Sequence, residues 1–367
     1  MNKAIGLITT NYANENFGKL AESRPVATVP FGGRYRLVDF PLSNMVHSGI
    51  RCVGITTAHS YRSLIDHLGS GKEWSLDRKS GGLFLLPGSI YGMKRFEGKF
   101  LLRDFIQNRP YLKRAKEDVV VVSASNKIYN MDFTPLLDQH FASGAQVTLV
   151  YKEIADAHMK RGPFLELDCS GKLRSIQRES AGNAAWFLDC FVINISDFLA
   201  LMDWYETMDY IDMTEIFSEN ITNMKIDSYR FDGYVGAVDS SYDYMRCSMD
   251  LLKREIRSEL FDSKRQIFTK VQDAPPSKYL SGSRVSNSFI SSGCVIECTV
   301  ENSILFRSVE IGKGAVIKNS IIMQRGKILP GAVLDNVICD KFVRISEDSR
   351  LSGNRYTPLV IGKSEQI

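Results

Sequence analysis

The sequence predicts an α/β domain built on a mostly parallel sheet, followed by a C-terminal parallel β-helix. In the first two thirds of the chain, short apolar segments alternate with helix-like segments, which is the pattern of parallel strands covered by helices. From about residue 283, apolar residues recur every six positions between small polar residues and glycines. That period is typical of a parallel β-helix.

The sheet is predicted from individual segments of the first domain. The β-branched run DVVVVS at residues 118–123 has no polar alternation, which indicates a strand buried on both faces. Nucleotides bind such sheets at the carboxyl ends of the strands, and we expect the site there. In chain order we expect strand 4–9, strand 51–57, helix 61–68, strand 118–123, helix 135–142 ended by Gly144, and strand 146–151.

The β-helix is predicted from Val316, Ile322, Ile328 and Leu334, which fall six residues apart. A small antiparallel sheet with regular turns is the alternative interpretation. The segment IGKGAVIKNS at residues 311–320 favours the β-helix, because it carries both the apolar period and the turn-forming glycines.

A change in composition separates the two regions. Residues 253–265 are highly charged and are expected to be helical, whereas Pro275 and Pro276 cannot lie in a helix interior and predict an extended linker. The expected domains are therefore residues 1–250, a helical segment and linker over 251–281, and the β-helix over 282–367.

Composition excludes several classes of protein. The chain has 367 residues and a net charge of +4, from 46 basic and 42 acidic residues, which is too mild a balance to indicate nucleic-acid binding. The apolar stretch near the N-terminus is too short for a secretory signal, and none is long enough to span a membrane, so we expect a cytoplasmic protein. The seven cysteines are odd in number and form no C-x2-C pair, which favours reduced, mostly buried thiols over disulfides or a zinc site.

One long motif carries a family resemblance. VPFGGRYRLVDFPLSNMVHSGI at residues 29–50 resembles the conserved block of the ADP-glucose pyrophosphorylases (glucose-1-phosphate adenylyltransferases), and the segments 127–133 and 242–252 fall where that family has similar runs. The resemblance covers essentially the whole chain and implies a Rossmann-like nucleotidyltransferase domain followed by a left-handed β-helix. It also implies a reaction of ATP with glucose 1-phosphate that releases pyrophosphate and needs a divalent metal held by carboxylates.

The residues that the resemblance places at the reaction centre depart from the family. The phosphate loop, G-G-x-G-x-R-L in the family, becomes a degenerate loop with Asn11, Tyr12, Asn14 and Asn16, and the remaining candidates Gly18 and Lys19 would make a weak cradle. The two metal carboxylates fall on Asn126 and Ala237, so we expect no catalytic residues, no metal and no cofactor in this chain. Asp239 is the alternative metal ligand, because it would point to the same face of a strand as Ala237.

The sugar-phosphate motifs are altered as well. The family's F-x-E-K-P appears at 176–179, where Arg178 is a candidate residual sugar-phosphate contact. S-M-G-I-Y becomes LDCFV at 188–192, and FEGKFLL at 96–102 stands near the absent G-T-A-D-A. Arg24 and Arg36 match two basic positions of the family's allosteric anion site, with surface or intersubunit salt bridges as the alternative.

Loss of the reaction centre beside an intact fold-bearing block resembles the family's non-catalytic partner in bacterial glycogen synthesis. We therefore expect a regulatory subunit with little or no activity alone, which enhances an active, magnesium-dependent sibling subunit in a heterotetramer and can form a homo-oligomer when alone. The alternatives are an active transferase with a rebuilt site, and a sugar-phosphate or nucleotide sensor without turnover. A β-helix acyltransferase lacks support, because no histidine follows His158.

Overall fold

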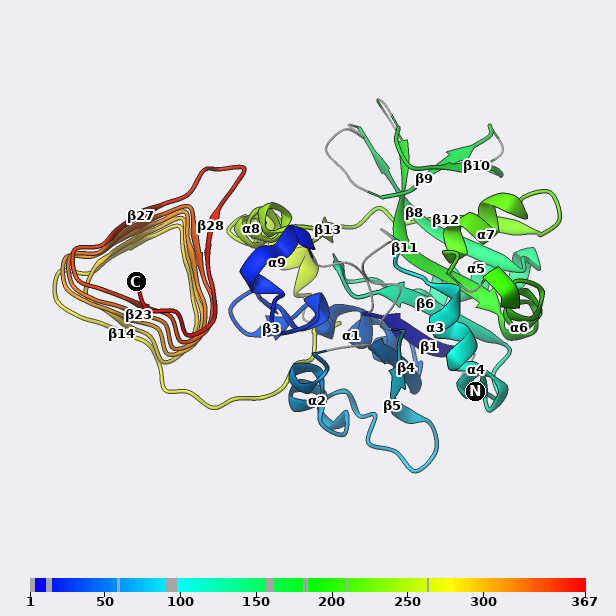
Figure 1. Ribbon diagram of the computed structural model, residues 1–367, viewed down its shortest axis with the longest axis horizontal. Helices are drawn as coiled ribbons and strands as arrows, with labels where there is room; N and C mark the ends of the chain where they lie inside the picture. Colours follow the sequence, from blue (N-terminus) through cyan, green and yellow to red (C-terminus); the bar gives the residue numbers. More distant parts are fainter. Residues whose placement is uncertain are drawn as a thin grey trace. The chain divides into compact units, whose positions relative to one another are not determined.

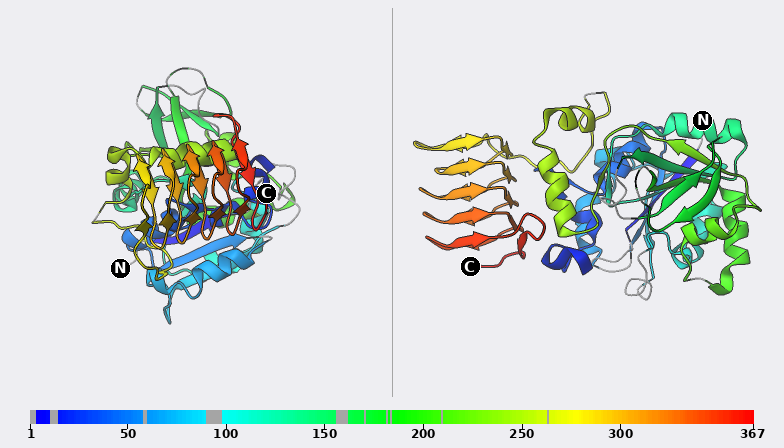
Figure 2. Two further views of the ribbon diagram at one scale, coloured as in Figure 1. Left: turned by 90° about the vertical axis from the view of Figure 1, so that its left-hand side faces the viewer. Right: turned by 90° about the horizontal axis from the view of Figure 1, so that it is seen from above.

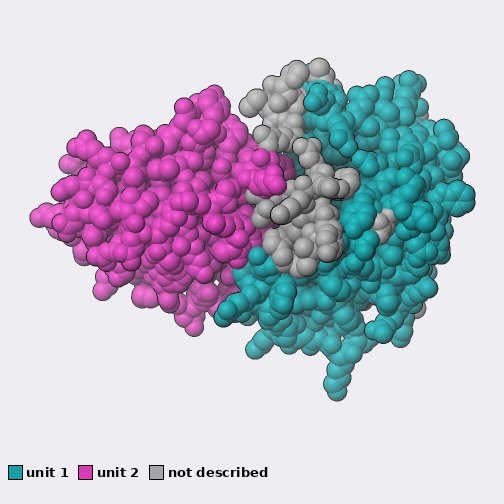
Figure 3. Space-filling model, in the orientation of Figure 1, with its two compact units in different colours: residues 1–13, 38–235, 264–268 teal, residues 14–37, 236–263, 269–367 magenta. Residues whose placement is uncertain are grey.

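The computed structural model of the chain divides into two compact units (Figures 1 and 3). Unit 1 comprises residues 1–13, 38–235 and 264–268, and unit 2 comprises residues 14–37, 236–263 and 269–367. The residues that the structure describes are 4–10, 15–57, 60–89, 98–155, 162–169, 171–180, 182, 184–208, 210–262 and 264–367.

Unit 1 is built on a mixed sheet that contains nine strands among the described residues. Strands β6, β1, β4 and β5 are parallel neighbours, and β11 joins β6 in the antiparallel sense. The expected strands at 4–9, 51–57, 118–123 and 146–151 are all present, and β6 is buried along its whole length. The strands are β1 (Ala4–Thr9), β4 (Cys52–Thr57), β5 (Gly82–Pro87), β6 (Val119–Ala124), β8 (Val147–Ile154), β9 (Phe164–Leu167), β10 (Leu173–Gln177), β11 (Ala184–Asn194) and β12 (Ile226–Arg230).

The helices of unit 1 follow the local signals in the sequence. The expected helix at 135–142 is α5 (Phe133–Ser143), which begins after the N-cap Asp132 and ends at Gly144 with φ of 60°. The other described helices are α1 (Asp39–His47), α2 (Arg62–Leu68), α3 (Leu102–Gln107), α4 (Arg109–Lys113), α6 (Ile195–Trp204) and α7 (Met213–Glu219); the short strand β7 (Lys127–Ile128) follows β6.

The β-helix of unit 2 consists of three parallel sheets of five strands each, all within residues 264–367, which the structure describes completely (Figure 2). Equivalent serines of successive coils, such as Ser303 and Ser320, lie 17 residues apart. The sheets are β14 (Lys278–Tyr279), β17 (Val295–Ile296), β20 (Glu310–Ile311), β23 (Lys327–Ile328) and β26 (Arg344–Ile345); β15 (Arg284–Ser286), β18 (Thr299–Glu301), β21 (Val316–Lys318), β24 (Val333–Asp335) and β27 (Arg350–Ser352); β16 (Phe289–Ile290), β19 (Ile304–Leu305), β22 (Ile321–Ile322), β25 (Val337–Cys339) and β28 (Leu359–Ile361).

The corners of the β-helix explain part of its composition. Asn302, Asn319 and Asn336 have φ of 47°, 44° and 55°, in the left-handed region that asparagine tolerates better than most residues. The predicted period is confirmed, but its phase is shifted at one position: Val316 is only half-buried, and Ile317 takes the interior place. A regular six-residue spacing missed this, because a 17-residue coil cannot be divided into three equal sides.

The two units do not follow the three consecutive blocks predicted from the sequence. Segments 14–37 and 236–263 belong with the β-helix in unit 2, and the first β-helix strand begins at Lys278 rather than after 281. The reason lies in long-range contacts, since Lys19 pairs with Glu365 and Gly33 packs against Ser291. These segments hold η1 (Glu15–Leu20), η2 (Val26–Thr28), β2 (Pro30–Phe31), β3 (Tyr35–Arg36), β13 (Gly236–Ala237), α8 (Ser241–Asp250) and α9 (Arg254–Leu260).

Other expectations can be compared with the described residues. The charged segment 253–265 contains helix α9, and Pro275 and Pro276 lie in a stretch without regular structure, as predicted. All seven cysteines are free thiols, and five of them are buried. Among the described helices, none is both long and apolar enough to cross a membrane.

Candidate functional site

The carboxyl ends of three parallel strands meet where the sequence predicts the site. At the end of β1, the Thr9 carbonyl accepts hydrogen bonds from the Ser125 backbone N–H and hydroxyl, at 3.1 and 3.0 Å. On the other side, the Thr10 hydroxyl donates to the Thr56 carbonyl at 2.6 Å. The ends of β6, β1 and β4 are thus fixed side by side.

The degenerate phosphate loop leaves this edge directly after Thr10. Asn11, Tyr12 and Asn14 lie outside the described residues, whereas Asn16 is exposed within the 3₁₀ helix η1. Of the remaining candidates, Gly18 has φ of 52°, and Lys19 forms an exposed ion pair with Glu365 at 2.6 Å. Lys19 therefore has a partner within its own chain.

The two positions that correspond to metal carboxylates hold buried, uncharged residues. Asn126 lies two residues after the end of β6 and is fully buried, and Ala237, in β13, is 4% exposed. An amide and a methyl group do not fit Mg²⁺, which requires anionic oxygen ligands. Among the described residues, no three His, Cys, Asp or Glu side chains are placed to hold a metal ion together.

Asp239 does not occupy the position that its spacing predicts. Strand β13 ends at Ala237, and Asp239 lies in a bend before Ser240, the N-cap of α8. The argument that Asp239 shares a strand face with Ala237 is therefore wrong, because alternation of side chains holds only within a strand.

Three of the altered sugar-phosphate and metal motifs meet in one buried cluster of charges. The Asp189 carboxylate oxygen Oδ2 lies 2.7 Å from Lys99 Nζ and 3.0 Å from Lys127 Nζ. Lys127 is 1% exposed, and its ammonium also lies 4.4 Å from the centre of the Trp186 ring. We call Lys99, Lys127 and Asp189 the lysine–aspartate cluster.

The backbone of β11 places the carboxylate of this cluster. Asp189 has φ of 50°, and the pairing of β11 with β8 shifts register between Phe187 and Phe191. Such an irregularity turns a side chain away from the direction that regular alternation gives it. Sequence reasoning missed the cluster; the only available signal was three charged residues within otherwise apolar segments.

A second buried carboxylate lies close by. Asp212 accepts the Phe100 backbone N–H at 2.8 Å and caps α7 by accepting the Thr214 backbone N–H at 2.9 Å. Burial raises the pKa of Asp212 above its ordinary value, and the negative charge of Asp189 raises it further. The hydrogen bonds that Asp212 accepts lower it, but by less. Gly98 leaves room for this carboxylate, since a Cβ there would overlap it.

The candidate sugar-phosphate contact Arg178 lies apart from the lysine–aspartate cluster. It follows β10, its side chain is 83% exposed, and it forms an ion pair with Glu215 of α7 at 2.9 Å.

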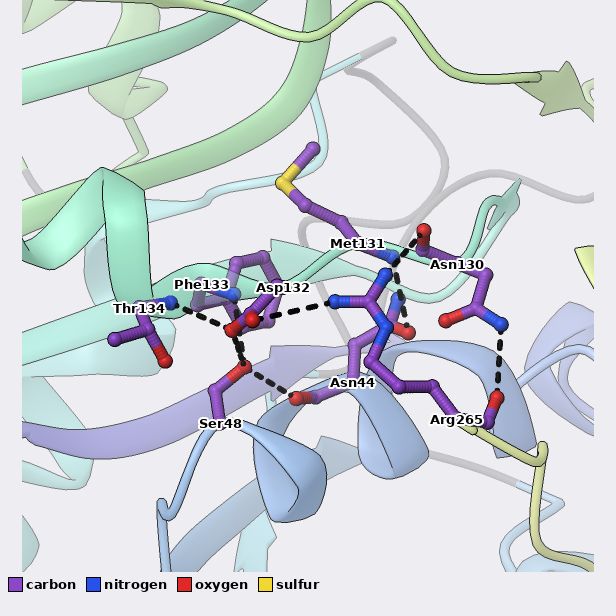
Figure 4. A network of polar contacts seen from close by, with 8 residues as sticks. All are labelled: Asn44, Ser48, Asn130, Met131, Asp132, Phe133, Thr134 and Arg265. Carbon is purple, nitrogen blue, oxygen red and sulfur yellow. Dashed lines mark hydrogen bonds and ion pairs between the residues drawn. The ribbon is translucent and has the colours of Figure 1, made fainter. Parts of the chain in front are cut away.

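The segment 127–133 is intact as a scaffold rather than as a reaction centre (Figure 4). Asp132 caps helix α5 and accepts the Ser48 hydroxyl at 3.3 Å, and Arg265 donates to the Asn130 carbonyl at 2.8 Å. Asn44 of α1 donates to the carbonyl of Tyr129 at 3.0 Å. Burial alone would raise the pKa of Asp132, but hydrogen bonds from the start of α5 and the Arg265 charge lower it.

The two residues predicted for an anion site lie in unit 2 beside further basic residues. Arg24 is 4% exposed and forms an ion pair with the fully buried Asp340, so its salt bridge is buried within the chain rather than on the surface or between subunits. Arg36 is half-buried in β3. Burial, together with the charges of Arg36 and Arg24, lowers the pKa of Lys341 to about 7, and Lys363 acts in the same direction.

Comparison with known proteins identifies the family. Residues 19–161 match the nucleotidyl transferase family, and residues 275–356 match the GlmU-like C-terminal hexapeptide family. The chain is 36% identical over 363 residues to the glycogen biosynthesis protein GlgD of Bacillus subtilis, which covers 99% of this chain and 96% of that protein. It is 38% identical to GlgD of Geobacillus stearothermophilus over 86% of this chain and 83% of that protein. It is 30% identical to a glucose-1-phosphate adenylyltransferase of Pseudothermotoga lettingae over 86% and 77% of the two chains.

The chain belongs to the glucose-1-phosphate adenylyltransferase family. Within this family it is close to the GlgD proteins. The predicted combination of a Rossmann-like nucleotidyltransferase domain and a left-handed β-helix of hexapeptide repeats is confirmed.

Proposed function

We propose that the chain is a partner subunit of glucose-1-phosphate adenylyltransferase in glycogen biosynthesis, with little or no activity of its own. The observation that carries the proposal is the chemistry of Asn126 and Ala237, which stand buried and uncharged at both positions where the family resemblance places metal carboxylates. Without an anionic protein ligand, the metal that neutralises a triphosphate has no fixed place.

The lysine–aspartate cluster supports the same proposal from the sugar-phosphate side. The Asp189 carboxylate forms ion pairs with both Lys99 and Lys127, in segments where this chain departs from the family's motifs. Charges already paired inside the protein are poor contacts for a substrate, because the existing pairs must break before new ones form.

Association with a catalytic sibling is the second part of the proposal, and exposed apolar groups on each unit favour it. On unit 1, Trp204 and Met208 are 82% and 54% exposed, although Met202 and Tyr205 of the same segment belong to the core. On unit 2, Tyr279 of the first β-helix coil is 55% exposed. Apolar side chains exposed in the free chain are available to be buried against another subunit. We propose that these surfaces contact active subunits in a heterotetramer and shift them toward their competent conformation.

The decisive experiment compares the lone chain with a mixture. The chain, the glucose-1-phosphate adenylyltransferase of the same organism, and the two together are assayed for ADP-glucose formation at fixed ATP, glucose 1-phosphate and Mg²⁺. We expect background rates for the lone chain, and a higher kcat/KM for the mixture than for the sibling mixed with an inert protein. Robust turnover by the lone chain would refute the first part of the proposal, and an unchanged sibling would refute the second.

Two variants separate this proposal from an active transferase that uses Asp239. Asp239→Asn is expected to leave the enhancement of the sibling unchanged, because the residue lies outside β13. Asn126→Asp combined with Ala237→Asp is expected to stay inactive alone, because the phosphate-loop segment still lacks the family's glycines and arginine. If the lone wild-type chain is active and Asp239→Asn abolishes that activity, the rebuilt site is the correct interpretation.

A ligand-sensing role is the second candidate, favoured by the basic residues of unit 2. Arg24 is paired with Asp340, so we propose that an anionic effector would contact Arg36, Lys341 and Lys363 instead. Calorimetry with phosphorylated glycolytic intermediates tests this, with Lys363→Ala as the variant and Lys327→Ala as the matched control. Equal heats from the two variants would exclude the basic residues as an effector site.

A further inference from the structure

The lysine–aspartate cluster is unusual because one carboxylate forms ion pairs with two buried ammonium groups. Lys127 is 1% exposed and Asp189 is 3% exposed, and the side chain of Lys99 is 12% exposed. An ammonium group buried without compensation costs several kcal/mol, so the cluster depends on the Asp189 charge. The Trp186 ring stabilises Lys127 further through a cation–π contact.

The three residues come from three separate segments that the family uses for substrate. Lys99 lies in the segment that stands near the family's G-T-A-D-A, Lys127 follows the lost metal carboxylate, and Asp189 lies within the run that replaces S-M-G-I-Y. The family's motifs have no lysine at the places of Lys99 and Lys127, and no aspartate at the place of Asp189. The structure joins the three departures through direct ion pairs, which indicates one correlated change.

The structure assigns to Asp189 the role of a built-in anion that closes the sugar-phosphate subsite of unit 1. Its carboxylate satisfies Lys99 and Lys127 in the place of a ligand phosphate. This inference rests on the proposed non-catalytic function. It adds that the ion pairs of Asp189 with Lys99 and Lys127 exclude the sugar phosphate. The left-handed backbone of Asp189 fits this role, since a strained conformation persists where the surrounding contacts hold it.

Removing the carboxylate tests the inference by creating an anion site. Asp189→Ala is expected to lower the folding constant by about two to four powers of ten, as for other buried pairs that lose one partner. Inorganic phosphate and glucose 1-phosphate are then expected to restore stability in a saturable way, by about a hundredfold in the folding constant at 100 times the dissociation constant. Both proteins carry Lys363→Ala, so that the proposed effector site of unit 2 does not contribute, and the protein with Asp189 intact, the wild type of this test, is expected to show neither saturable stabilisation nor binding heat.

The controls separate this role from that of an ordinary ion pair. Glu215→Ala removes the carboxylate from the exposed ion pair with Arg178. Phosphate is expected to change the stability of this variant no more than chloride at equal ionic strength does. If Asp189→Ala is too unstable to purify, Asp189→Gly carries the same test, because it also vacates the carboxylate position and glycine adopts the φ of 50° found there.

Three results would overturn the inference. These are saturable binding of glucose 1-phosphate to wild type, unchanged stability of the Asp189 variant, and rescue of that variant by formate but not by phosphate or glucose 1-phosphate. Rescue by formate alone would mean that the space left by the carboxylate admits an anion of that size, but not a phosphate group. Turnover by the lone wild-type chain is measured separately and bears on the proposed function, so the two failures can be distinguished.

Discussion

Replacing Asp340 by asparagine is expected to destabilise unit 2, because this carboxylate is the buried partner of Arg24. Asp340 is fully buried and Arg24 is 4% exposed, and the Arg24 Nε–H also donates to the Leu20 carbonyl at 2.9 Å. Asparagine keeps the size of the side chain, and it can still accept the Lys341 backbone N–H that now donates to Oδ1 at 2.6 Å. The change therefore removes charge and little else.

The magnitude follows from the burial of the pair. Breaking a buried ion pair by removing one partner costs about 3–5 kcal/mol, which lowers the folding constant by about two to four powers of ten. The Asp340 charge also opposes the neighbouring positive charges at Lys341, so its loss adds repulsion among Arg24, Arg36 and Lys341.

The assay can follow the two units separately. All three tryptophans, Trp74, Trp186 and Trp204, lie in unit 1, so their fluorescence reports unit 1, whereas far-UV circular dichroism also reports the β-helix. In urea, Asp340→Asn is expected to shift the dichroism transition to lower concentration more than the fluorescence transition. The matched control is Glu310→Gln, which breaks an exposed pair with Lys327 and is expected to cost less than about 1 kcal/mol. Equal midpoints for the two variants would refute the reasoning.

Three further predictions follow from the described contacts. Burial and basic neighbours lower the pKa of Lys341 to about 7, so between pH 7 and about 10 the unfolded chain binds more protons than the folded chain. The free energy of unfolding is therefore expected to rise with pH across that window, and to rise less in Lys341→Met. Urea midpoints at several pH values measure this. Asn319→Ala is expected to cost about 1–2 kcal/mol because φ is 44° there, with Asn319→Gly much milder; equal midpoints would exclude corner strain. Asp132→Ala is expected to cost about 1 kcal/mol through loss of the α5 cap, and the tryptophan-fluorescence transition checks it against Asp132→Asn.

Local patterns predicted the regular elements of the fold well. The strand at 4–9 and the helix ended by Gly144 were predicted because apolar runs and a left-handed glycine are local signals. The β-helix was predicted because its period repeats often enough to exceed chance. The sequence did not predict which residue of each repeat faces the interior. Ile317 rather than Val316 points inward, and only the actual length of the coil decides this.

Long-range contacts set the limit of prediction for the site. The positions of Asn126 and Ala237 came from the family resemblance, but the partner of Arg24 lies 316 residues away and that of Lys99 lies 90 residues away. Ion pairs between such distant residues leave no periodic signal in one sequence. The bend that holds Asp239 was missed for a related reason, because the length of β13 depends on its pairing rather than on its composition.

The positions of the buried charges bear on how the proposed partner subunit keeps its fold. An enzyme cleft must keep polar groups unsatisfied for its substrate, and bound ligand then stabilises the folded state by mass action. In this chain Asp189 satisfies Lys99 and Lys127 from within, so the fold gains that stabilisation at any ligand concentration. A subunit whose task is to hold a sibling in its competent conformation benefits from this arrangement, because its own shape does not change with the supply of sugar phosphate.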